Sequence, residues 1–271
     1  MLRNVMRRRL DEELRIVSLA PSATAILCAV GARSALVGVT KWCADVADVG
    51  GLPRVGDCWH MGSVQEILQL RPTLVIGSVP FKAETVAKLL EAPVNFLAKN
   101  PRTLADVERD VRMLARIVGR AAAGERVVGR MRREFAAIAA RAKKKPRGRV
   151  RVYCEAWPNP RISSPPWVAE LVELCGGEMV VPSGARVSDE EVAAAAPEVI
   201  VLAWTATGAK ARPKQAYSVA AWRDVPAIQA RRVFVVRDEL LNTPGPPLVQ
   251  GARQLWRILR GVRSQPADAR R

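Results

Sequence analysis

Short apolar runs alternate with segments of helical spacing along the first hundred residues. Runs rich in Val, Ile and Leu predict strands at 15–19, 36–39, 73–77 and 94–97. Between them lie predicted helices at 64–70 and 81–90, and one that opens at Pro21-Ser22, with Ser22 as its N-cap, and ends at Gly31. Because short links join strands and helices in alternation, residues 15–100 are predicted to form an α/β lobe.

The pattern changes in the middle of the chain. From Thr103 to Lys144 no strand-like run occurs, and apolar residues recur at helical spacing. Gly119 and Gly124 are expected to interrupt or kink this helical stretch, and the basic run 143–148 is expected to end it. We therefore expect residues 101–147 to connect two parts of the chain through helix.

A second α/β lobe is predicted over residues 148–262. Its signals are strands at 150–154, 199–203 and 232–236, helices at 166–175 and 248–259, and a capping box of Ser188 with Glu191. The order helix, proline, strand at 64–77 repeats at 189–203. Two similar lobes on a helical spacer predict a cleft between them, where ligands commonly bind. The flanks are a basic tail, 1–14, and a polar tail, 263–271.

The charge balance is strongly basic, with 43 Lys and Arg against 26 Asp and Glu and a net charge of +17. A protein with this much positive charge can bind a nucleic acid or an acidic membrane surface. The basic residues are spread over the chain, so the interpretation we favour is scattered solvated charge. No nucleic-acid motif accompanies them, and we expect no nucleic-acid partner.

The compartment is predicted from the N-terminus and the cysteines. No apolar stretch is long enough to span a membrane, and acidic residues stand where a secretory signal has its apolar segment: Asp11, Glu12 and Glu13. The five cysteines form no C-x-x-C pair, which fits a reduced compartment. The sequence as written therefore predicts a cytoplasmic protein, unless its true start lies further upstream.

Catalytic motifs for nucleophilic hydrolysis or nucleotide binding do not occur in the sequence, and the chain has one histidine, His60. Cys58 and His60 are predicted to line a loop or pocket, with catalysis or a metal contact as less favoured alternatives. Cys43 could join them as a metal ligand. These observations favour a binding protein over an enzyme, and no catalytic cofactor is expected.

Tryptophan is over-represented among the aromatic residues, at seven against two Tyr and four Phe. Trp42, Trp157 and Trp204 follow predicted strands, and Trp59 lies in a predicted loop. Ligands of α/β sheets bind outside the carboxyl ends of the strands, so these indoles predict a pocket for a large planar ligand. The alternative is that each one fills a lobe core, which is the interpretation we prefer for Trp222 and Trp256.

Several motifs resemble a known family in order along the chain. They are "RIVSLAPSATAI", "GLPRVG", "SVQEILQLRPTLVIG", "WVAELVELCGG", "ARVSDEEVAAAAPEVIVLA", "AWRDVPAIQARRVFVV" and "TPGPPLVQGARQL". The chain resembles the class III substrate-binding proteins of ABC importers, and its cobalamin-binding subgroup in particular. The resemblance implies an α/β fold of two Rossmann-like lobes joined by a long rigid helix. It also implies non-catalytic binding of a corrinoid for uptake or salvage, with haem or a ferric siderophore as alternative ligands.

The resemblance further implies which residues act. Ligand-binding positions correspond to Ser22, Thr24, Lys41, Trp42, Cys43, Trp59, His60, Ser78, Trp157, Trp204, Asp238 and Glu239. His60 could contact the cobalt. Family members dock onto a permease through one exposed acid on each lobe, which corresponds here to Glu190 and, beside Gln65 at the matching position, to Glu66. The expected state is a monomer, and the family's compartment is periplasmic or extracytoplasmic.

Overall fold

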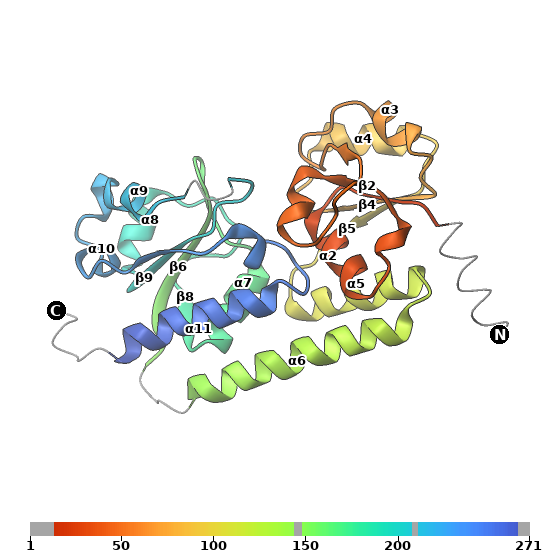
Figure 1. Cartoon of the computed structure of the whole chain (residues 1–271). Helices are drawn as coiled ribbons and strands as arrows, with labels where there is room; N and C mark the ends of the chain where they lie inside the picture. The colour runs from red at the N-terminus through yellow and green to blue at the C-terminus, as the bar shows by residue number, and fades with distance from the viewer. Residues whose placement is uncertain (1–13, 144–147, 208–210, 265–271) are drawn as a thin grey trace. The chain divides into compact units, whose positions relative to one another are not determined.

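The computed structural model describes residues 14–143, 148–207 and 211–264 (Figure 1). The chain divides after Arg130 into two compact units, called unit 1 and unit 2 below. The division falls inside helix α6 (Ala121–Lys143), which is continuous across it and lies in the segment predicted as the connector. Each unit has its own five-stranded sheet, so the predicted fold class of two α/β lobes joined by a long helix is confirmed.

Unit 1 is built on five parallel strands in the order β3-β2-β1-β4-β5. The strands are β1 (Ile16–Ser18), β2 (Leu36–Thr40), β3 (Arg54–Val55), β4 (Leu74–Ser78) and β5 (Phe96–Lys99). Parallel neighbours need crossover connections, and here these are short helices. They are α2 (Pro21–Ala29), α3 (Val64–Gln69) and α4 (Ala83–Glu91), with 3-10 turns at Arg33–Ala35 and Lys41–Asp45; α5 (Leu104–Ile117) follows β5.

Helix α2 begins earlier than the sequence predicts. Ala20 is the extended N-cap residue, and Pro21 is the first helical residue. Proline suits that position because the N–H it lacks would have no partner within the helix. Ser22 therefore lies inside the helix with its side chain buried, and the prediction that it caps α2 is wrong. Gly31 follows the helix with φ +78°, as predicted.

The long helical stretch consists of α5 and α6, separated at Gly119, whose φ is +68°. Gly124 was also expected to interrupt the stretch, but it lies inside α6. A Cβ atom at this position would come within 2.5 Å of the Ala115 Cβ atom. The glycine therefore permits a close approach of α6 to α5 instead of ending a helix.

Unit 2 contains a mixed sheet in the order β10-β9-β6-β7, with β8 also paired to β6. Its strands are β6 (Val150–Pro158), β7 (Arg161–Ser163), β8 (Gly177–Met179), β9 (Val199–Leu202) and β10 (Val233–Val235). Strand β6 is parallel to β8 and β9 and antiparallel to β7. It runs four residues beyond the predicted strand because its second half pairs with β7.

The helices of unit 2 are α7 (Pro166–Leu174), α8 (Asp189–Ala194), α9 (Pro213–Tyr217), α10 (Pro226–Gln229) and α11 (Leu248–Ser264), with 3-10 turns at Ala220–Trp222 and Asp238–Leu240. The predicted capping box of α8 is confirmed. The Ser188 hydroxyl accepts from the Glu191 N–H at 3.1 Å, and the Glu191 carboxylate accepts from the Ser188 N–H at 2.7 Å. None of the helices described is both long and apolar enough to cross a membrane.

The packing of α11 gives a first prediction. A Cβ atom at Gly251 would lie 2.0 Å from the Leu240 carbonyl oxygen, a backbone atom that cannot rotate away. We expect Gly251→Ala to lower the free energy of unfolding by about 2–4 kcal/mol, measured by urea titration. The control is Gly261→Ala in the same helix, where no atom lies within 4 Å. It should be neutral or stabilise by up to about 1 kcal/mol, and an equal loss in both variants would contradict this packing.

Candidate functional site

Four neighbouring strands of unit 1 end on a polar residue whose side chain is buried. These residues are Thr40, Ser18, Ser78 and Lys99, at the ends of β2, β1, β4 and β5. Because the strands are parallel, all four lie at one edge of the sheet, called the carboxyl edge below. The strand order reverses at β1, between β2 and β4, and ligands of open α/β sheets bind at such a switch point.

A cluster of hydroxyls and a thiol fixes the turn after β2. The Thr24 hydroxyl lies 2.9 Å from the Ser18 hydroxyl and 3.1 Å from the Cys43 sulfur, and the Thr40 hydroxyl lies 3.2 Å from the same sulfur. Burial raises the pKa of the Cys43 thiol, which is therefore neutral. The Thr24 hydroxyl and the Cys43 thiol thus form a hydrogen bond with each other, which holds the turn 41–45 against α2.

That turn presents two of the predicted binding residues. Lys41 is exposed, and its Nζ atom lies 4.6 Å from the centroid of the half-buried Trp42 ring. The contact is a cation–π interaction at the surface of unit 1. It places a positive charge and an indole together at the end of β2.

A buried lysine lies at the end of β5. The Lys99 Nζ atom is 3.3 Å from the Ser22 hydroxyl and 3.5 Å from the Asp110 carboxylate, and burial lowers the pKa of Lys99. The Ser78 hydroxyl, on the neighbouring strand, is buried and has no hydrogen-bond partner among the residues described. Sequence reasoning missed Lys99, although a lysine that ends an apolar strand was a signal for it.

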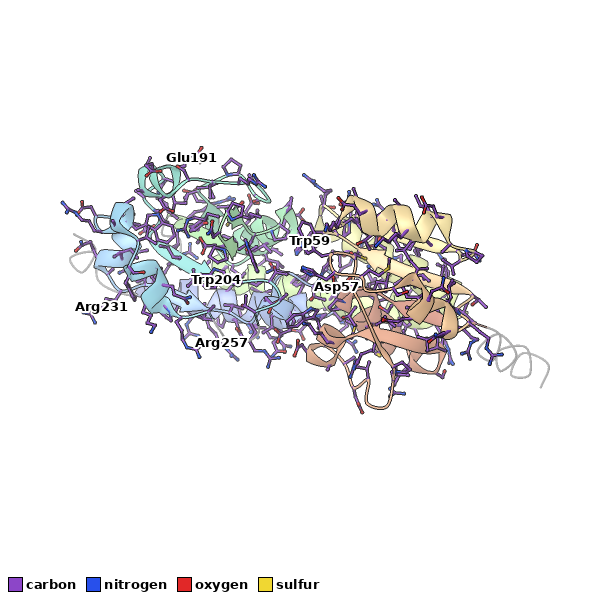
Figure 2. The ribbon with its side chains drawn as sticks, turned by 90° about the horizontal axis from the view of Figure 1, so that it is seen from above. Asp57, Trp59, Glu191, Trp204, Arg231 and Arg257 are labelled. Carbon is purple, nitrogen blue, oxygen red and sulfur yellow. The ribbon has the colours of Figure 1, made fainter. Side chains whose placement is uncertain are left out.

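The loop after β3 turns one side chain inward and two outward. The Asp57 carboxylate accepts from the backbone N–H groups of Trp59 at 2.9 Å and His60 at 2.6 Å, which tightens the turn. Cys58 is buried, and burial raises its pKa to about 11. Trp59 is 48% exposed and His60 is exposed (Figure 2 labels Asp57 and Trp59).

The Cys58 side chain anchors this loop on the carboxyl edge. Its thiol donates to the Leu19 carbonyl oxygen at 3.7 Å, just beyond β1. A Cβ atom at Gly77 would approach the Cys58 sulfur to 2.6 Å, so β4 needs its glycine for the thiol to fit. The anchor holds Cys58 at the ends of β1 and β4, and the exposed Trp59 and His60 follow it directly in the loop.

Metal ligation was a less favoured prediction for Cys43, Cys58 and His60. Across residues 14–143, 148–207 and 211–264, no three His, Cys, Asp or Glu side chains gather as a metal site would need. Cys43 and Cys58 instead contact hydroxyl and carbonyl groups.

The tryptophans of unit 2 differ in exposure. Trp157 was predicted to follow its strand, but it lies within β6, where it is 38% exposed and its Nε1–H donates to the Asn159 carbonyl at 2.8 Å. Trp204, just after β9, is buried in the core of the unit. Asp238 accepts from the Ala206 N–H at 3.1 Å, and the buried Glu239 carboxylate pairs with Arg237.

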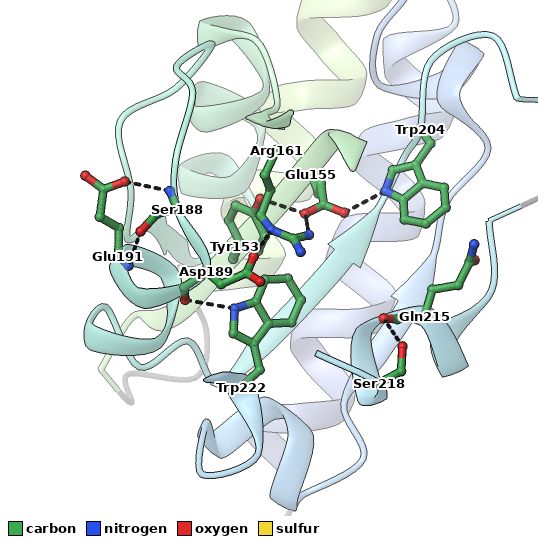
Figure 3. A network of polar contacts seen from close by, with 10 residues as sticks. All are labelled: Tyr153, Glu155, Arg161, Ser188, Asp189, Glu191, Trp204, Gln215, Ser218 and Trp222. Atoms are coloured by element: carbon green, nitrogen blue, oxygen red, sulfur yellow. Dashed lines mark hydrogen bonds and ion pairs between the residues drawn. The ribbon is translucent and has the colours of Figure 1, made fainter. Parts of the chain in front are cut away.

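A buried network lies where Glu155 of β6 pairs with the last residue of β9, at the edge of the unit 2 sheet that precedes Trp157 and Trp204 (Figure 3). The Glu155 carboxylate is fully buried and accepts from the Tyr153 hydroxyl at 2.8 Å, from the Trp204 Nε1–H at 2.7 Å and from Arg161. Burial, followed by the Glu155 charge, raises the pKa of Tyr153. The carboxylate therefore has a donor for both oxygens and a cation to balance its charge.

Arg161 extends the network to helix α8. Its Nε atom lies 2.7 Å from the Asp189 carboxylate, and its guanidinium lies 4.3 Å from the Trp222 ring centroid. The Trp222 Nε1–H donates to the Asp189 carbonyl at 3.0 Å (Figure 3). The first residue of α8 is thus held by the same cation that balances Glu155.

The two predicted docking acids lie in first turns of helices. Glu190 is exposed at the second position of α8, and its pKa is lowered by a hydrogen bond to its own backbone N–H and then by Ser188. In unit 1 the Ser63 hydroxyl caps α3 by accepting from the Gln65 N–H at 3.1 Å. Counting from the caps, Gln65 matches Glu190, and the exposed Glu66 takes the next position.

Residues 16–240 match the family described as periplasmic binding protein. The chain belongs to that family. The family predicted from the sequence motifs is therefore confirmed, and its members bind substrates without transforming them.

Two curated relatives extend over most of the chain. An uncharacterised ABC transporter substrate-binding lipoprotein, YvrC of Bacillus subtilis (strain 168), is 25% identical over 255 residues, or 90% of this chain and 79% of the relative. A vitamin B12-binding protein of Vibrio parahaemolyticus is 26% identical over 240 residues, or 86% of this chain and 84% of the relative.

A solved structure has the same fold. The periplasmic heme-binding protein RhuT from Roseiflexus sp. RS-1, in its apo form, superposes with a TM-score of 0.79 at 24% identity. The match covers 93% of this chain and 99% of the other. The heme-binding protein from Roseiflexus thus has the fold of this chain over nearly its whole length.

The buried network gives a second prediction. Glu155→Ala would leave the Arg161 guanidinium buried beside one remaining carboxylate, so we expect a loss of about 3–5 kcal/mol in the free energy of unfolding. The control is Glu178→Ala, which removes an exposed partner of Arg151 at 3.7 Å in the same sheet and should cost under about 1 kcal/mol. Equal losses in the free energy of unfolding, measured by urea titration, would show that the buried network stabilises the protein no more than an exposed ion pair does.

Proposed function

We propose that this protein binds a corrinoid without transforming it and presents it to an ABC-type permease. The observation that carries the proposal is an exposed tryptophan at the carboxyl edge of each unit, Trp59 in unit 1 and Trp157 in unit 2. The vitamin B12-binding relative from Vibrio parahaemolyticus supports the choice of ligand.

The chemistry of these edges suits a large ring with polar side groups. An indole offers a flat apolar face on which a macrocycle can stack. Because these indoles are partly exposed to water, stacking would remove apolar surface from water. The exposed Lys41 and the neighbouring Trp42 add a hydrogen-bond donor and a third aromatic face. An exposed His60 beside Trp59 provides an imidazole for a contact with the cobalt.

A second candidate ligand is haem, with ferric siderophores beside it. The observation in its favour is the likeness in fold to the heme-binding protein from Roseiflexus. Haem carries two carboxylates, which the exposed Lys41 charge would attract. Because both ligands fit this fold, binding tests are needed to distinguish a corrinoid from haem.

The proposal predicts which tryptophans matter. Trp59→Ala and Trp157→Ala should each weaken cobalamin binding about tenfold, because each removes a stacking face and the area it buries. Affinity is read from the quenching of tryptophan fluorescence and from calorimetry. The control is Trp256→Phe on α11, where the half-buried indole contacts Arg141 and Arg260, and affinity should not change.

Two results would count against this assignment. Unchanged cobalamin affinity in both alanine variants would show that Trp59 and Trp157 do not contact the ligand. Saturable quenching by haem or a ferric siderophore, with none by any corrinoid, would transfer the ligand assignment to the second candidate.

Docking to a permease is the other part of the proposal. The carboxylates of Glu190 and Glu66 are exposed, so permease arginines could reach them and form charge-assisted pairs. The Glu66→Ala/Glu190→Ala variant should lose corrinoid uptake in cells while its affinity for free corrinoid stays unchanged. The matched control replaces Glu91 and Glu173, which are exposed on other helices, and should transport normally.

The docking role requires the extracytoplasmic side of a membrane. The lipoprotein relative from Bacillus subtilis supports that compartment. Normal uptake by the double variant would contradict docking through these acids, and so would fractionation that finds the protein only in the cytosol.

A further inference from the structure

Residues 131–143 of α6 and helix α11 lie side by side in unit 2 (Figure 1). The Arg253 guanidinium is 2.7 Å from the Glu134 carboxylate, and the Arg263 guanidinium donates to the Ala142 carbonyl at 3.0 Å. The contacts follow the same order along both helices, so the two helices run parallel. Residues 131–143 of α6 and helix α11 are therefore neighbours along their length in unit 2.

This surface is basic. Helix α11 contains four arginines and no acidic residue, and residues 131–143 of α6 contain four basic residues and one acid, Glu134. Arg253, Arg257 and Arg260 are exposed and recur at spacings of four and three, so they share one side of α11. With the exposed Arg141 of α6 they form what we call the basic face.

Among the residues that the structure describes, the charges of the basic face are largely uncompensated. Glu134 pairs with Arg253. Arg141, Arg257 and Arg260 have no carboxylate partner in the part of the chain that the structure describes. Helix dipoles favour positive charge in last turns, which accounts for Arg141 but not for Arg257 in the middle of α11.

The Trp256 ring makes cation–π contacts with two of these arginines. The Arg141 and Arg260 guanidiniums lie 5.8 Å and 5.2 Å from the centroid of its half-buried ring. Each contact is favourable, but the two like charges repel each other. An anion that reaches this side of the unit relieves the repulsion, so the basic face is arranged to attract anions.

We propose that the basic face binds the anionic headgroups of a lipid membrane. Arginines along one side of a helix with a tryptophan among them are typical of surfaces that lie on membranes. The apolar side of α11 is buried within unit 2, through Leu248, Leu255 and Leu259. The helix therefore cannot insert, and the binding is peripheral, electrostatic and reversible.

Nucleic acid fits the same face less well. Single-stranded nucleic acid binds where bases stack on open aromatic rings along a groove. Here guanidiniums lie over the aromatic ring of the face, Trp256, and the arginines stand along a convex helix. The membrane proposal is independent of the ligand, because it uses no residue assigned to corrinoid binding.

The test is cosedimentation of the full chain with vesicles. Binding is expected to vesicles that contain phosphatidylglycerol, not to pure phosphatidylcholine, and should fall as salt rises above about 0.1 M. Arg257→Gln/Arg260→Gln should lower the partition coefficient about 30-fold, since each basic residue near an anionic surface contributes about 1 kcal/mol. Arg257→Lys/Arg260→Lys should retain binding.

The matched control is Arg223→Gln/Arg231→Gln, which removes the same charge from exposed positions of unit 2 (Figure 2 shows Arg231 and Arg257 at separate places). It should bind nearly as well as the unchanged protein. If the Arg257 and Arg260 double variant fails to fold by circular dichroism, Arg257→Gln alone should still lower binding about fivefold.

Three results would overturn the proposal. An equal loss in the control would mean that net charge alone drives binding. Failure of the unchanged protein to bind anionic vesicles would exclude the membrane. Tighter binding of a DNA or RNA oligonucleotide than of vesicles, lost in the same double variant, would assign the face to nucleic acid.

Discussion

Parallel strands can be joined only by segments that cross back over the sheet, so the carboxyl ends of all parallel strands reach one edge. In unit 1 this constraint brings together residues that are far apart in the sequence, such as Ser18, Thr40 and Ser78. In unit 2 it does the same for the residues that follow β9 and β10. The candidate binding residues depend on this geometry more than on any local motif.

Buried polar groups hold the loops on those edges. In unit 1 the thiols of Cys43 and Cys58 lie under the turns that carry Trp42 and Trp59. In unit 2 the Glu155 carboxylate holds Trp204, and Arg161 extends the same network to Asp189, the residue before Glu190. The candidate ligand edge and the proposed docking helix are thus fixed by one set of interactions within unit 2.

Local sequence signals predicted the local features well. Apolar runs predicted the central strands, Gly31 the end of α2, and Ser188 with Glu191 the capping box of α8. Long-range features could not be predicted in this way. Strand β6 extends through Trp157 because β7 pairs with it, and no residue of β6 itself signals that pairing.

The candidate site shows the same limit. Trp59 and Trp204 are the same residue type near strand ends, yet one is exposed and the other buried. Trp204 packs in the core of unit 2 and donates its N–H to Glu155, a carboxylate 49 positions away. Lys99 and Arg161 escaped the sequence analysis because a charged residue is buried only where a partner compensates it, and the sequence does not mark Asp110 or Glu155 as that partner.

We propose that this member of the periplasmic binding protein family retains a corrinoid. The most direct measurement is the absorption spectrum of the protein after incubation with cobalamin, haem or a ferric siderophore and removal of free ligand by desalting. The account predicts that the cobalamin spectrum stays with the protein at one ligand per chain. Retention of haem or the siderophore, with cobalamin lost to the desalting column, would contradict it.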